Sequence, residues 1–167
     1  MDSAQIVPAL GKDFESAEVQ ILVGALQSKH VPRAKRDDPD AYVEAKRDGV
    51  ALMFVDDDYI NRRRVAAYGN APMVLVSATL YTGSQDKDPS YSRFMGSLPG
   101  GVAFTDPIES LGEKLGDPSL VYESKGIVFT RQWRRDNVLM TFKYNKAGVL
   151  QYVQLIWDAY MKRMNEG

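Results

Sequence analysis

Apolar residues recur at two different spacings along the chain, and each spacing predicts one kind of element. Residues 17–26 carry apolar side chains three and four positions apart, which is typical of a helix with one buried face. We expect that helix to begin near Ser16, whose hydroxyl suits an N-cap. The residues of its apolar face are Val19, Leu22, Val23 and Leu26.

Apolar runs and two-residue alternation predict six β-strands and two further helical segments. The strands are expected at residues 41–46, 50–55, 73–81, 126–133, 138–144 and 149–157. Asp106 as N-cap, followed by Pro107 and Glu109, predicts a short helix over residues 107–115 that ends before Gly116. Residues 29–42 are polar and predict a loop or the start of an edge strand, and residues 158–165 predict a terminal helical turn.

Two segments, one in each half, resemble one another. Residues 47–54 and residues 135–142 both begin with Arg-Asp, continue with Gly49 or Asn137, and end in an apolar run. Gly and Asn accept the positive φ of a tight hairpin turn, so each half is expected to contain a hairpin. Internal duplication explains the match, and so does the plain fact that many hairpins begin with Asp-Gly or Asp-Asn.

The pattern as a whole predicts an α+β fold made of two pseudo-repeated units, each a helix followed by an antiparallel meander, in one compact protein. The first unit is expected at residues 1–82 and the second at residues 90–167. Residues 83–89, rich in Gly, Ser, Asp and Pro, are expected to be a mobile connector.

Composition narrows the function classes. The chain has 167 residues, 44% of them hydrophobic, and a formal net charge of −1, so no bulk positive field favours nucleic acid or an anionic membrane. Zero cysteines exclude disulfides, thiolate metal sites and cysteine nucleophiles. The first residues lack the basic and apolar regions of a secretory signal, and no run approaches the roughly 20 apolar residues of a membrane span. We therefore expect a cytoplasmic protein.

No catalytic constellation can be assembled from the sequence. His30 is the only histidine and no Gly-x-Ser-x-Gly motif accompanies it. Asp56, Asp57 and Asp58 are adjacent and lack the spacing of a calcium loop. Basic clusters at residues 62–64 and 131–135 can grip phosphates, although strands that alternate Arg with core residues read the same way. We expect no enzyme, no cofactor, no metal site and no direct nucleic-acid binding.

Several motifs carry a family resemblance. The run Gly96-Ser97-Leu98-Pro99-Gly100-Gly101-Val102-Ala103-Phe104, then Leu111 to Leu115 with Gly116-Asp117-Pro118, then Tyr144-Asn145-Lys146-Ala147-Gly148, resembles small bacterial immunity proteins encoded beside polymorphic toxins. The opening Leu10-Gly11-Lys12-Asp13-Phe14 is similar to how such chains begin. The helix-then-strands order is also similar to the outer-membrane assembly lipoprotein BamE, from which the chain departs because it has no lipid-attachment cysteine. The resemblance implies a protein that binds and neutralises a cognate toxin, or else an adaptor or assembly-factor binding module.

Acidic residues gather around the first predicted hairpin, beside a tyrosine. Many toxins of this class are basic nucleases, and an acidic surface would speed their capture through charge complementarity. The alternative interpretation is that these residues solvate two loops. The predicted partner-binding residues are Asp37, Asp38, Asp40, Asp56, Asp57, Asp58 and Tyr59.

Overall fold

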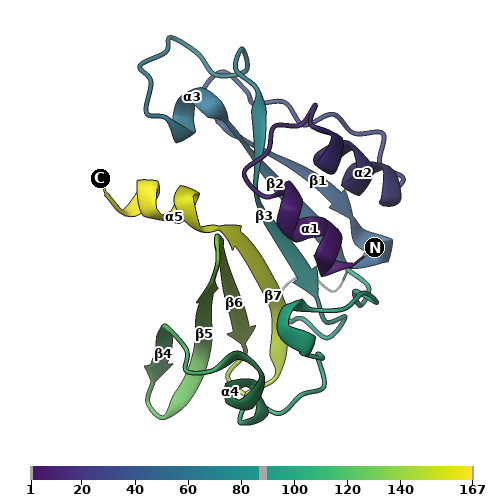
Figure 1. Ribbon diagram of the computed structural model, residues 1–167, viewed down its shortest axis with the longest axis vertical. Helices are drawn as coiled ribbons and strands as arrows, with labels where there is room; N and C mark the ends of the chain where they lie inside the picture. Colours follow the sequence, from purple (N-terminus) through teal and green to yellow (C-terminus); the bar gives the residue numbers. More distant parts are fainter. Residues whose placement is uncertain (1, 87–89, 167) are drawn as a thin grey trace.

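The computed structural model describes residues 2–86 and 90–166 and shows one seven-stranded antiparallel sheet in the order β1-β2-β3-β7-β6-β5-β4 (Figure 1). The strands are β1 (Asp40–Ala45), β2 (Val50–Asp56), β3 (Met73–Tyr81), β4 (Leu120–Ser124), β5 (Ile127–Arg135), β6 (Val138–Tyr144) and β7 (Leu150–Trp157). The helices are α1 (Ser3–Ala9), α2 (Ala17–Ala25), α3 (Asp57–Ile60), α4 (Ser110–Leu115) and α5 (Asp158–Asn165). Two 3-10 turns, η1 (Lys46–Asp48) and η2 (Pro99–Gly101), complete the described elements. The predicted α+β class is confirmed.

The helices α1 and α2 cover one face of β1, β2 and β3, on the side turned toward the viewer in Figure 1. The predicted apolar face of α2 is buried as expected. The sequence pattern missed α1, which contains Pro8 and is too short to show a helical period. A reciprocal capping box between Asp2 and Gln5 holds its first turn.

The second half contains one strand more than predicted, and its helix begins later. All five residues of β4 are exposed, so the burial periodicity that marks a strand is absent there. Asp106 does not cap the helix as predicted: its carboxylate accepts a hydrogen bond from the Ala103 amide at 2.7 Å and pairs with Lys114. Consequently α4 starts at Ser110, after a turn.

The two Arg-Asp segments do not occupy equivalent places. In the first, Arg47 and Asp48 lie in η1, inside a four-residue loop that ends with Gly49 at φ 69°. In the second, β5 continues through Arg135 and pairs with Val138, so the loop has only two residues, and the positive φ falls on Asp136 rather than on Asn137. The apolar strands after the turns do share a phase, as predicted: both bury alternate residues in the same core, namely Val50, Leu52 and Phe54, and Val138, Met140 and Phe142. A pseudo-repeat is not established by this arrangement.

The two predicted halves share the sheet. Pairing of β3 with β7 joins them, from Ser77 opposite Ile156 to Tyr81 opposite Tyr152. Of the predicted connector, residues 87–89 lie outside the described residues. Just before the connector, the Thr82 hydroxyl donates to backbone carbonyls of β7, and within its described part the Asp86 amide donates to the Gln151 side chain. No helix in the described part of the chain is long and apolar enough to cross a membrane.

Candidate functional site

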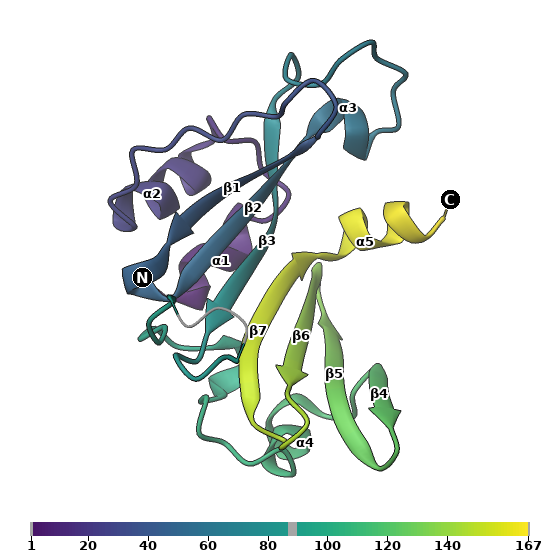
Figure 2. The same cartoon turned by 180° about the vertical axis from the view of Figure 1, so that it is seen from behind.

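The helices α3 and α5 meet at one end of the sheet, on the face opposite to the main core. Both views show α5 running from the end of β7 toward α3 (Figures 1 and 2). Adjacent strand residues point to opposite faces, and here Phe54 and Leu75 join the main core while Val55 and Val74 form a second, smaller cluster. That second cluster packs Val55, Ile60, Val74 and Val76 against Met53, Trp157 and Tyr160.

A buried carboxylate fixes the start of α5. Asp158 is 1% exposed and contacts Nε of Arg134 at 2.8 Å and Nζ of Lys162 at 2.7 Å. The hydrogen bond from Lys162, together with the charge and hydrogen bond of Arg134, holds the pKa of Asp158 below its ordinary value, against the opposing effect of burial. The helix is thereby anchored to β5, which places Tyr160 over the second cluster.

One of the predicted contact residues is structural. Asp56 is 0% exposed; its Oδ1 accepts from the Asp58 amide at 3.0 Å and its Oδ2 accepts from the Gly69 amide at 2.8 Å. It therefore caps α3 and fastens the loop that leads back to β3. A residue buried and bonded in this way is not available at the surface to a partner.

The next two aspartates are engaged by a neighbouring arginine. Arg63 Nη1 lies 3.3 Å from Oδ2 of Asp57 and 2.9 Å from Oδ1 of Asp58. Both carboxylates are partly exposed, so they remain reachable. The local negative field is nevertheless reduced by this cation.

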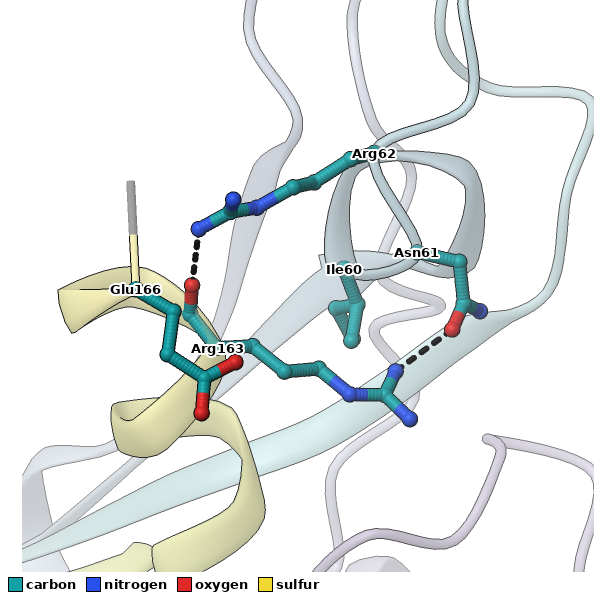
Figure 3. A pocket seen from close by; sticks show the side chains of 5 residues that line it. All are labelled: Ile60, Asn61, Arg62, Arg163 and Glu166. Carbon is teal, nitrogen blue, oxygen red and sulfur yellow. Dashed lines mark hydrogen bonds between the residues drawn. The ribbon is translucent and has the colours of Figure 1, made fainter.

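A cleft of about 180 Å³ separates α3 from α5 (Figure 3). It is lined by Ile60, Asn61, Arg62, Arg163 and Glu166. The Arg62 guanidinium donates to the Arg163 carbonyl, and the Arg163 guanidinium donates to the Asn61 side-chain oxygen. Because both guanidinium groups already have partners that hold the helices together, the cleft is a helix junction.

Near this junction, two carboxylates and three phenols are close enough to act on one another electrostatically. We call this set the tyrosine patch: Asp38, Asp40, Tyr42, Tyr59 and Tyr160. Tyr42 is 51% exposed and Tyr59 is 36% exposed. Burial raises the pKa of Tyr160 to about 12, and the proximity of Asp40, Tyr59 and Tyr42 acts in the same direction.

One of the two carboxylates of the tyrosine patch, Asp40, is partly desolvated. Burial is the main cause that raises the pKa of Asp40, and the charge of Asp38 adds to it. Burial likewise raises the pKa of Tyr42, with Asp40 and Asp38 contributing. The sequence identified Asp38, Asp40 and Tyr59 but missed Tyr42 and Tyr160. The alternation of Asp40, Tyr42 and Glu44 along β1 could have indicated Tyr42, whereas only the fold brings Tyr160 there.

The acidic residues at this end of the molecule are matched in number by basic residues of the same segments. Residues 33–40 and 56–64 hold six acids and also six bases, so their formal charges cancel. The bases are Arg33, Lys35, Arg36, Arg62, Arg63 and Arg64. Asp37 is exposed in the same segment but is not among the groups that act on Tyr42 or Tyr160.

The remaining candidate residues lie elsewhere in the fold. His30 is exposed in the loop after α2, where its amide donates to Ser28. In the basic cluster of β5, Trp133 is 2% exposed and donates to the Gly116 carbonyl, and Arg131 donates to the Ile108 carbonyl. Over the residues that the structure describes, no group of three or more His, Cys, Asp or Glu side chains is placed to hold a metal ion.

Comparisons with known proteins assign no family. No family model matches the chain, and no curated protein matches it. Among solved structures, the chain is similar to a cysteine-rich secretory protein from Staphylococcus aureus subsp. aureus Mu50, with 9% identity and a TM-score of 0.42. The match covers 90% of this chain and 45% of that one, so the chain spans less than half of its length.

Proposed function

We propose that this chain is an immunity protein that binds a cognate secreted bacterial toxin in the cytoplasm and neutralises it by occluding the toxin's active site. The observation that carries the proposal is the tyrosine patch, in which the exposed rings of Tyr42 and Tyr59 accompany one partly buried carboxylate, Asp40, and one exposed carboxylate, Asp38. Tyrosine is enriched among the residues that dominate binding energy in protein interfaces, because its ring buries a large area and its hydroxyl still forms hydrogen bonds. The sequence resemblance to immunity proteins supplies the kind of partner.

The geometry favours short-range contact over long-range attraction. Six acids and six bases at this end cancel in formal charge, so a distant partner meets little net field. Burial of Tyr42 and Tyr59 against a complementary surface would instead determine how long the complex lasts. A basic nuclease domain remains the partner class that fits the carboxylates Asp38 and Asp40.

The test is co-purification of the tagged chain from a host that also expresses the neighbouring toxin gene. Capture of the toxin, with survival of the host, is the expected result. Replacing Tyr42 by Ala should weaken capture by about tenfold, the loss of an interface anchor. Tyr122, which is 58% exposed on β4, provides a matched control that should bind as the wild type does when changed to Ala. Capture of a secretion or envelope component, with no toxin bound, would instead support an adaptor or assembly factor.

A further inference from the structure

At each end of β1 a carboxylate on the outer face of the strand is accompanied by a tyrosine ring. Asp40, Tyr42 and Glu44 alternate along the strand and share one face. Near Glu44 the set is completed within the chain: the Tyr91 hydroxyl donates to the Glu44 carboxylate, and the Lys46 ammonium lies 5.4 Å from the centre of the Tyr91 ring. A carboxylate, an aromatic ring and a cation therefore satisfy one another there.

At the other end of β1 the ring and the carboxylates are present without such a cation. The ion pairs found among residues 2–86 and 90–166 do not include Asp38 or Asp40. The cation–ring contacts found in the same residues involve Tyr91 and Phe104 and not Tyr42.

Two arginines of the loop after α3 have other partners. Arg63 is bound to Asp57 and Asp58, and Arg62 donates to the Arg163 carbonyl. The groups that act on the Tyr42 and Tyr160 hydroxyls, besides burial, are carboxylates and phenols.

We propose that the tyrosine patch is a docking site for an arginine side chain of the protein partner, with the guanidinium over the Tyr42 ring and paired with the Asp40 carboxylate. The inference rests on the proposed function and names the chemistry of the partner at that site. Arginine fits better than lysine because its planar guanidinium can stack on a ring and present two N–H groups to a carboxylate at once. A divalent metal fits less well, since it prefers several anionic oxygens, and burial raises the pKa of the Tyr42 and Tyr160 phenols, which favours their neutral forms.

A short arginine peptide tests the docking site without the toxin being known. The probe is a capped tetrapeptide with two arginines, titrated into the isotopically labelled protein and followed by amide chemical shifts. The same peptide with citrulline in place of arginine is the control, because citrulline keeps the shape and loses the charge. We expect saturable shifts at residues 40–44 and 158–160 with the arginine peptide and none with the citrulline peptide.

Two variants and one matched control locate the site. Tyr42→Ala and Asp40→Asn should each weaken the arginine peptide by about fivefold, in line with a cation–ring or charge-assisted contact at the surface. Tyr122→Ala removes an exposed tyrosine that is also next to an acid, Glu123, and should leave binding unchanged. Equal shifts at Glu123, equal binding by the citrulline peptide, or unchanged binding in Tyr42→Ala would each overturn the inference. Peptide binding at the patch without toxin capture would leave the arginine site standing and reject the proposed function.

Discussion

Removing the Asp56 carboxylate should destabilise the fold much more than removing the carboxylate of its neighbour Asp57. Asp56→Ala deletes the cap of α3, worth about 1 kcal/mol, and leaves the end of that helix without its acceptor. It also deletes the hydrogen bond that the Gly69 amide donates to a charged oxygen, worth about 1.5–3 kcal/mol. Together we expect the free energy of unfolding to fall by about 3 kcal/mol. For a chain of this size that loss corresponds to a melting temperature lower by about 6–12 °C.

The measurement is urea unfolding at neutral pH, with Asp57→Ala as the control. Asp57 is partly exposed and pairs with Arg63, so its loss should cost at most about 1 kcal/mol. Equal losses in the two variants, or a loss below about 0.5 kcal/mol in Asp56→Ala, would refute the assignment of Asp56 as structural. The result also decides how the surface can be probed, because charge reversal at Asp56 would place a lysine in a buried site and confuse binding with unfolding.

Three further outcomes follow from single groups. Asp158→Asn should make the free energy of unfolding depend less on pH between pH 7 and pH 2. The pKa of Asp158 is lower in the folded state than its ordinary value of 3.8, so the carboxylate contributes stability above that value. This stability is lost as the pH falls through the pKa of the folded state. Burial raises the pKa of Tyr144 to about 12, so the stability that its neutral form contributes is complete below pH 10 and is lost between pH 10 and 12. Absorbance at 295 nm should show a late titration, and Tyr144→Phe should reduce its amplitude and leave the part that belongs to Tyr160. Gly49→Ala should melt well below Gly126→Ala in a thermal scan, because both have positive φ but only at Gly49 would a Cβ lie 2.4 Å from a backbone oxygen.

Periodicity predicted most elements of the fold because most of them bury one regular face. The face of α2, the hairpin of β1 and β2, and α5 all lie where the pattern placed them. The exceptions lack that signal. Strand β4 is exposed along its whole length and is held by pairing with β5, and α1 is short and depends on its capping box.

The candidate site was predicted only in part, because local sequence does not tell which way adjacent acids point. Asp56, Asp57 and Asp58 read alike in the sequence, yet they span the junction where β2 ends and α3 begins. The first turns inward to cap the helix and the other two face Arg63. Tyr160 joins the patch from the far end of the chain because the β3–β7 pairing brings α5 beside α3.

The arrangement of charge changes what an acidic segment can do for a binding protein. Long-range steering depends on net charge over distances beyond the Debye length, about 8 Å at physiological salt. At this end six acids are balanced by six bases, so salt should alter the association rate little. Asp40 acts instead at contact distance, where it is already partly desolvated and a guanidinium would complete its pairing. Binding at the tyrosine patch should therefore owe its affinity to a slow dissociation rate. Variants of Tyr42 and Asp40 should change the dissociation rate more than the association rate.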